Sequence, residues 1–299
     1  MAAKSSTSRR WTTWLKVAGT LVSLGLLVWL LSRLDLPELL SIASGVPIGV
    51  LLLSLVLLTT RVFAHTFRWR SLLKGQKIEV PYRELLGLQY GSFFASNFLP
   101  TTVGGDVIRL VGILGKTSNR VGGAASIVVD RAMGVFAMLF FLPLSFPILG
   151  GFLATLGIAI GGVELPDYVR SAARRVWDAT TLWLKSPASL VVALLASWVG
   201  IMVYFLFIWM LARGLGMDVS LAQVAGVTAV TYFLALIPFT INAYGLRELS
   251  IIALYSSLGA SAEQAAALAL LSRFLILVSS LPGAYTVWGA FLKDDSTHD

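Results

Sequence analysis

Two similar sets of arginines and carboxylates lie inside apolar stretches of this chain. The first set is Gly104-Gly105-Asp106, Arg109 and Asp130-Arg131, and the second is Gly245, Arg247-Glu248 and Arg273. A charged side chain in a bilayer core costs about 3 kcal/mol or more, so such residues usually face a polar cavity and mark a site. A guanidinium group binds phosphate through parallel hydrogen bonds. The chemistry predicted is therefore recognition of a phosphodiester or a similar anion, with one arginine of each set forming a two-sided clamp.

The charged sets follow helix-breaking residues in both halves of the chain. Leu99-Pro100 precedes the first set and Ile237-Pro238 precedes the second. Apolar segments interrupted by glycine and proline at matching places in two halves indicate a transporter built from internal repeats. The helix that starts near Gly104-Gly105 would have free N–H groups and a positive dipole end, which suit a phosphate or a carboxylate.

The residues predicted to bind a substrate carry the charges of the two sets and the polar groups at their turns. They are Asn97, Gly104, Gly105, Asp106, Arg109, Asp130, Arg131, Thr240, Asn242, Tyr244, Arg247, Glu248 and Arg273. We expect no catalytic residue, no metal site and no cofactor. Asp106 and Glu248 are the groups best placed to take up or release protons if transport is coupled to them.

A second interpretation of the same charges needs no ligand. Asp106 would cap its helix and pair with Arg109 and Arg131, and Arg273 would pair with Glu248, so that the pairs hold the broken segments in place. The two interpretations are compatible, because a substrate phosphate could compete for the same arginines.

The composition is that of a membrane protein. The 299 residues are 57% hydrophobic and 13% charged, whereas ordinary soluble domains are about 25% charged. The net charge of +8 fits basic cytoplasmic loops and attraction to anionic lipid headgroups. The basic residues flank apolar spans, which argues against nucleic acid as a partner, and the absence of cysteine excludes disulfides and thiol chemistry.

The apolar runs predict an all-α integral membrane protein with about six transmembrane helices and two re-entrant helical hairpins. The predicted spans are Trp11–Leu31, Val46–His65, Gly123–Leu142, Pro147–Gly162, Ala188–Ala212 and Glu263–Gly289, and the hairpins lie in Leu85–Leu114 and Leu221–Leu258. Each hairpin is too interrupted for one span, and apolar pieces of 10–14 residues are more often re-entrant or interfacial.

Loop charge predicts the orientation in a bacterial cytoplasmic membrane, with the N- and C-termini in the cytoplasm. Arg68 and its basic neighbours are assigned to a cytoplasmic loop. A single membrane domain, 1–299, would then contain a first repeat at 46–142 and a second at 188–289, each a span, a hairpin and a span, with opposite orientations. Residues 164–185 would form an interfacial amphipathic helix that joins the repeats, although a plain cytoplasmic helix is an equal alternative.

The motifs taken together resemble one family. Asn97-Phe98-Leu99-Pro100, Gly104-Gly105-Asp106, Arg109, Asp130-Arg131, Pro238, Gly245, Arg247-Glu248 and Arg273 are similar to the lysylphosphatidylglycerol synthase transmembrane-region, or flippase-like, family. The resemblance extends from about residue 10 to residue 290. It implies a membrane domain that moves lipid between leaflets, without the soluble domain that carries the aminoacyl-transfer chemistry.

The expected function is translocation of a phospholipid or a lipid-linked headgroup through a polar cavity. One alternative is a non-catalytic partner of a lipid or glycolipid biosynthesis complex. Another is an integral-membrane transferase for polyprenyl-linked substrates, which is disfavoured because the chain has two histidines and no Asp-x-Asp motif. Membrane lipids are the expected partners. A second copy of the chain, in a homodimer, and a lipid-synthesis enzyme are further possible partners.

Overall fold

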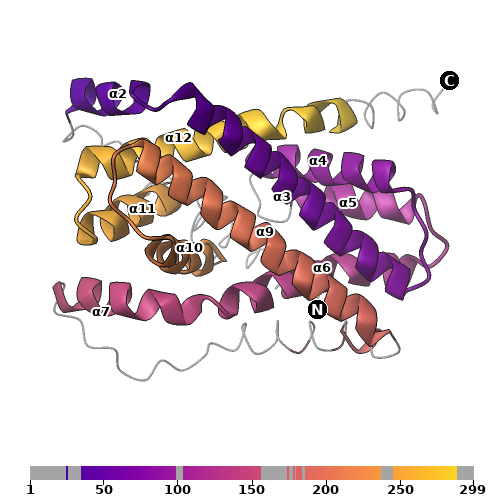
Figure 1. Cartoon of the computed structure of the whole chain (residues 1–299). Coiled ribbons are helices and arrows are strands. Elements are labelled where there is room, and N and C mark those ends of the chain that lie inside the picture. The colour runs from indigo at the N-terminus through magenta and orange to yellow at the C-terminus, as the bar shows by residue number, and fades with distance from the viewer. Residues whose placement is uncertain are drawn as a thin grey trace, which may run out of the picture.

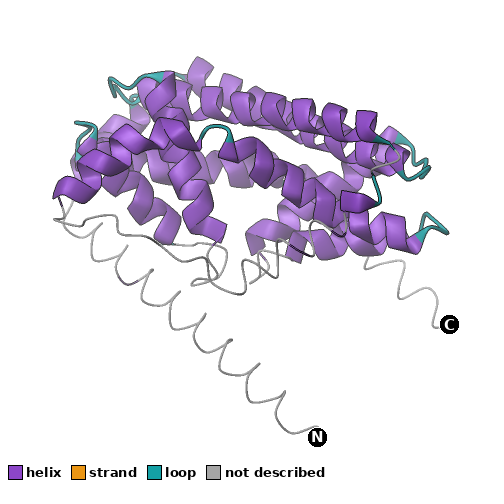
Figure 2. Cartoon of the chain, turned by 90° about the horizontal axis from the view of Figure 1, so that it is seen from below, coloured by secondary structure: helices purple, strands orange, loops and turns teal. Residues whose placement is uncertain are grey.

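The computed structural model of the chain describes residues 25, 35–98, 104–155, 174, 178, 180–183, 186–236 and 245–287. Every regular element within these residues is a helix (Figure 2). The predicted all-α membrane fold is therefore confirmed.

Four helices are long and apolar enough to cross a membrane. They are α3 (Ile48–Gly75), α6 (Arg120–Leu139), α9 (Pro187–Gly214) and α12 (Ala262–Ser280). They correspond to four of the six predicted spans. The predicted span Trp11–Leu31 lies outside the described residues except for Gly25, and the span predicted at Pro147–Gly162 is described only over α7 (Phe146–Thr155).

Each predicted hairpin is a pair of shorter helices. The first consists of α4 (Tyr82–Phe98) and α5 (Gly104–Leu114), and the second of α10 (Leu221–Leu236) and α11 (Leu246–Ser257). The two helices of each pair pack against each other. At 1.5 Å per residue, the 11 residues of α5 extend about 16 Å, which is about half of a 30 Å hydrocarbon core.

The remaining described elements are short. They are α2 (Leu36–Ser44) and the 3₁₀ helix η1 (Leu142–Ser145). The Asp35 side chain accepts a hydrogen bond from the Glu38 backbone N–H and caps α2. Most of the amphipathic helix predicted at 164–185 lies outside the described residues.

Helix lengths repeat in the two halves of the chain. Helices α3, α4, α5 and α6 contain 28, 17, 11 and 20 residues. Helices α9, α10, α11 and α12 contain 28, 16, 12 and 19 residues. Two stretches of chain therefore form the same series of a long helix, two short helices and a long helix.

The first helices of the two series, α3 and α9, lie side by side and run in opposite directions (Figure 1). Gly75, at the end of α3, lies against Ser189 near the start of α9, and Gly214, at the end of α9, lies against Val50 near the start of α3. Gly200 faces His65 near the middle. The contact between the halves therefore runs along both helices.

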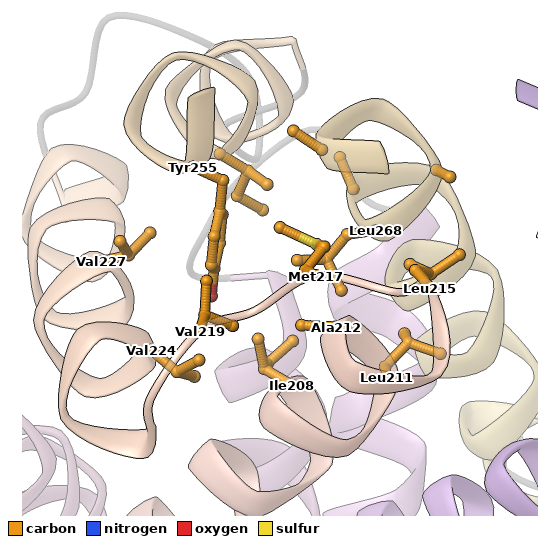
Figure 3. Close-up of a cluster of buried hydrophobic side chains, with 14 of the residues drawn as sticks. Ile208, Leu211, Ala212, Leu215, Met217, Val219, Val224, Val227, Tyr255 and Leu268 are labelled. Atoms are coloured by element: carbon orange, nitrogen blue, oxygen red, sulfur yellow. The ribbon is translucent and has the colours of Figure 1, made fainter. Parts of the chain in front are cut away.

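The largest apolar core joins the second series of helices (Figure 3). Ile208 and Leu211 of α9, Val227 of α10, Tyr255 of α11 and Leu268 of α12 meet there, with exposures of at most 5%. Lipid tails are as apolar as leucine, so close van der Waals packing and polar contacts, more than the hydrophobic effect, hold membrane helices together.

The outer surface is apolar as well. Ile48, Val111, Val121 and Phe140 are 66–72% exposed. Large apolar side chains at such exposure suit contact with lipid, and they leave the interior of the helix bundle as the place for charge.

Candidate functional site

A cavity of about 470 Å³, with both charged and apolar side chains in its wall, lies between the two series of helices. Its lining comes from α3, α4, α5 and α6 of the first series and from α9, α10 and α11 of the second. The charged residues in the lining are Arg61, Arg68, Asp106, Arg109, Asp130, Arg131 and Arg247. The cavity therefore brings together members of both charged sets.

Asp130 is the most enclosed carboxylate in the cavity wall, with 1% of its surface exposed. Arg68 forms a two-pronged contact with it, Nε to Oδ1 at 2.6 Å and Nη2 to Oδ2 at 2.9 Å. Arg109 Nη1 approaches Asp130 Oδ2 to 2.9 Å, and Arg68 Nη1 also donates to Ser197 Oγ of α9 at 3.4 Å. Two guanidinium groups thus share one carboxylate and connect α3, α5, α6 and α9.

The assignment of Arg68 to a loop is wrong. Helix α3 continues to Gly75, and Arg68 is 7% exposed because its charge is paired with Asp130 inside the bundle. The predicted span ended at His65 because charges follow that residue. A helical signal was nevertheless present, because Arg61, His65 and Arg68 are spaced i, i+4, i+7 and share one helix face.

Arg109 is also held by an aromatic ring. Its guanidinium carbon lies 4.2 Å from the centroid of the Trp69 ring, and the indole N–H of Trp69 donates to Ser126 Oγ at 3.0 Å. A cation over the face of tryptophan is attracted by the ring's negative face. Trp69 and Ser126 therefore position Arg109, and the charge motifs alone gave no indication of Trp69.

Asp106 forms the ion pair with Arg131 that the second interpretation predicted. Arg131 Nε donates to Asp106 Oδ2, and Arg109 Nη1 is 3.7 Å from Asp106 Oδ1. The Arg131 side chain is 44% exposed, compared with 14% for Asp106. Arg131 is therefore the more accessible member of this pair.

Glu248 forms the corresponding pair in the second set, and it has a second role as well. Arg273 Nη2 lies 3.0 Å from Glu248 Oε1, and Arg247 Nη1 lies 3.3 Å from the same oxygen. Glu248 Oε2 accepts from the Gly245 backbone N–H at 2.9 Å, and Gly245 has a φ of 79° at the start of α11. The positive φ favours glycine, so Gly245 and Glu248 together begin this helix.

Arg247 extends from the second set to the cavity. Its Nη2 lies 3.3 Å from Tyr204 Oη and 3.2 Å from Ser272 Oγ. Tyr204 belongs to α9 and Ser272 to α12. Arg247 therefore reaches the cavity while contacting two helices of its own series.

The two carboxylate–arginine pairs occupy the same register. Asp106 and Glu248 are each the third residue of their helices, α5 and α11. Arg131 and Arg273 are each the twelfth residue of α6 and α12. The partners are 25 residues apart in both pairs.

Some candidate residues lie away from the cavity lining. Asn97 is 8% exposed and its side chain donates to the Phe93 carbonyl at 2.9 Å. Gly104 and Gly105 are buried, and a Cβ on Gly105 would collide with the Ser92 carbonyl and the Ser96 hydroxyl. The backbones of α4 and α5 thus approach so closely that position 105 has no room for a side chain. Thr240, Asn242 and Tyr244 lie outside the described residues.

Several cavity residues were absent from the predicted set, Arg61 and Tyr204 among them. The guanidinium carbon of Arg61 lies 4.4 Å from the centroid of the Tyr204 ring. Other polar side chains in the lining are Gln89, Ser92, Ser96, Thr228, Thr231 and Tyr232. They belong to apolar helices, where a single hydroxyl or amide side chain forms no recognisable sequence motif.

Long apolar helices around an arginine-rich cavity define a helical integral membrane protein with a charged internal site. The family model described as Lysylphosphatidylglycerol synthase TM region matches residues 16–283. The chain therefore belongs to this family. A search of the curated proteins found no match.

Proposed function

We propose that this protein is a lipid translocase, which moves phospholipid or lipid-linked headgroups between the leaflets of the cytoplasmic membrane. The observation that carries the proposal is the cavity of about 470 Å³, which lies inside an apolar exterior and is lined by arginines from both helix series and by two aspartates from the first. A charged site within a bundle of apolar helices is typical of a substrate pathway. Membership of the family supports a role in lipid handling.

In this proposal the headgroup enters the cavity and the acyl chains stay in the bilayer. Arg109, Arg131 and Arg247, which line the cavity, bind the headgroup phosphate. Arg273 lies outside the lining and acts indirectly, through its ion pair with Glu248. Asp106 and Glu248 neutralise the arginines when the site is empty. A phosphate competes with these carboxylates because both offer paired oxygens to a guanidinium.

Alternation of access between leaflets would come from the two helix series. Antiparallel packing of α3 and α9 and the shared register of the two ion pairs support an inverted repeat with re-entrant hairpins. In such transporters one repeat rocks against the other around a site near the bilayer midplane. We place both termini in the cytoplasm of a bacterium on the basis of the loop charges.

One observation favours a second function, that of a non-catalytic partner in a lipid-synthesis complex. Asp106, Asp130 and Glu248 are all ion-paired, which is what arginines with a purely structural role would produce. This alternative predicts that arginine variants change assembly or thermal stability and leave lipid exchange unchanged.

The test is exchange of fluorescent phosphatidylglycerol between leaflets of proteoliposomes. The variants are Arg131→Gln in the cavity and Arg213→Gln, whose side chain is 49% exposed and pairs with Asp218. We expect exchange in the wild type and in Arg213→Gln and its loss in Arg131→Gln, with equal protein content and equal Tm. Wild-type exchange no faster than in empty liposomes, for several headgroups, would reject the translocase and favour the partner role.

A further inference from the structure

The charge of the cavity wall is unbalanced. Five arginines and two aspartates line the cavity, which leaves three more positive than negative charges. Glu248 and Arg273 lie behind the wall and neutralise each other, so including them does not change this difference. Cationic groups held inside apolar surroundings are unfavourable without a counter-charge.

The acidic groups in this region already have cationic partners. Asp130 is shared by Arg68 and Arg109, and Asp106 is paired with Arg131. Within the described part of the chain, the cavity lining therefore offers an incoming ammonium group no unpaired carboxylate.

Arg61 is the cavity arginine with the weakest compensation. Among the described residues, its guanidinium has neither a carboxylate nor a hydrogen-bond acceptor as partner, and its contact is the Tyr204 ring at 4.4 Å. Arg68 and Arg247 add repulsion from like charges. The side chain is half-buried and lines the cavity, so its N–H groups are available to a ligand there.

An aromatic wall could in principle hold a quaternary ammonium group instead. Tyr204 and Tyr232 do line the cavity. However, the Tyr204 ring already carries the Arg61 guanidinium, and a second cation beside five arginines would be repelled. The observations favour an anion.

We propose that the cavity selects a phosphate-bearing group with net negative charge, and that Arg61 is the residue that sets this preference. The inference rests on the proposed function for placing a lipid headgroup in the cavity. A phosphodiester would bridge Arg61 and the accessible Arg131 without displacing Arg68 or Arg109 from Asp130. A zwitterionic or cationic headgroup would bring a positive charge that this wall does not compensate.

The test measures binding to the purified full-length protein in neutral detergent, independently of transport. The probes are short-chain phosphatidylglycerol, phosphatidylcholine, lysylphosphatidylglycerol and inorganic phosphate. We expect phosphatidylglycerol to bind at least about tenfold more tightly than the other two lipids, a difference of about 1.4 kcal/mol. Tighter binding of phosphatidylglycerol than of inorganic phosphate identifies a lipid as the source, and equal binding identifies a soluble anion.

The variants separate charge selection from folding. Arg61→Gln should abolish the preference for phosphatidylglycerol over phosphatidylcholine, and Arg61→Lys should restore most of it, because lysine keeps the charge. Arg213→Gln, which alters an exposed pair, should bind like the wild type. Equal binding of all three lipids by the wild type, or an unchanged preference in folded Arg61→Gln, would overturn the inference.

Failure of the anion selection and failure of the translocase function give different experimental results. Selective binding of phosphatidylglycerol without leaflet exchange would reject the translocase and keep the anion site. Leaflet exchange at equal rates for all three headgroups would keep the translocase and reject the selection by Arg61.

Discussion

Arg68 and Asp130, 62 residues apart in the chain, form a two-pronged ion pair inside the helix bundle, with contacts of 2.6 and 2.9 Å. Arg109, which belongs to α5, forms an ion pair with the same carboxylate. Asp130 is therefore the shared acceptor that fixes α3 and α5 against α6. Its negative charge also prevents two buried guanidinium groups from facing each other uncompensated.

Removing the carboxylate of Asp130 should destabilise the protein strongly. We expect Asp130→Ala to lower the free energy of unfolding by about 3–5 kcal/mol, because it leaves buried charge without its partner. Thermal unfolding in detergent, monitored by tryptophan fluorescence, measures the effect. The double variant Asp130→Ala/Arg68→Leu should recover part of the loss, and a Tm equal to that of the wild type in Asp130→Ala would contradict the buried pairing.

The exposed ion pair between Arg213 and Asp218 should behave differently. The Asp218 side chain is 99% exposed, and exposed pairs contribute about 0–1 kcal/mol. Asp218→Asn should therefore change the Tm little in the same unfolding experiment. A loss as large as that of Asp130→Ala would show that burial is not what distinguishes the two pairs.

Glu248 should show two separable contributions. Its charge pairs with Arg273 and Arg247, and its Oε2 accepts from the Gly245 N–H. Glu248→Gln removes the charge and can keep the cap, whereas Glu248→Ala removes both. We expect Glu248→Ala to be less stable than Glu248→Gln by about 0.5–2 kcal/mol, the usual contribution of a helix cap. Equal unfolding midpoints of the two variants would rule out a contribution from the cap.

A methyl group at position 105 should separate two helices. A Cβ there collides with the backbone carbonyl of Ser92, and backbone cannot rotate away as a side chain can. We expect Gly105→Ala to destabilise the protein by about 1–3 kcal/mol, as overpacking does, when measured by thermal unfolding.

Gly49 provides the matched control for this substitution. It also lies in a helix, α3, and a Cβ there meets no atom within 4 Å. Gly49→Ala should leave stability unchanged or raise it by up to about 1 kcal/mol, since alanine is the better helix former. Equal effects of the two substitutions would show that the packing of α4 against α5 does not require glycine.

The sequence indicated the helices well because their signals are local. Apolar runs of about 20 residues predicted four helices that the structure contains and that are long and apolar enough to cross a membrane. Glycine and proline predicted pairs of shorter helices in place of two further spans, since both disfavour helix continuation, and α4 with α5 and α10 with α11 are such pairs. The predicted pairs Arg131–Asp106 and Arg273–Glu248 are confirmed.

The candidate site was predicted only in part, because charged residues after an apolar run were taken to lie in a loop exposed to solvent. Arg68 was placed in a loop beyond the end of a span and Arg61 was not singled out, yet both line the cavity from α3. A charge ends a membrane span only if nothing within the bundle compensates it. For Arg68 that compensation comes from Asp130 on another helix, which no local pattern of α3 contains.

The sequence by itself determined the class of protein, the positions of the helices and the two charged sets. These properties depend on composition and on spacing within one segment. The tertiary structure alone decided that Arg68 and Arg109 share Asp130, that Arg61 meets the ring of Tyr204, and that both helix series enclose one cavity. Each of these contacts depends on the rotation of one helix against another, and packing between segments distant in the chain sets that rotation.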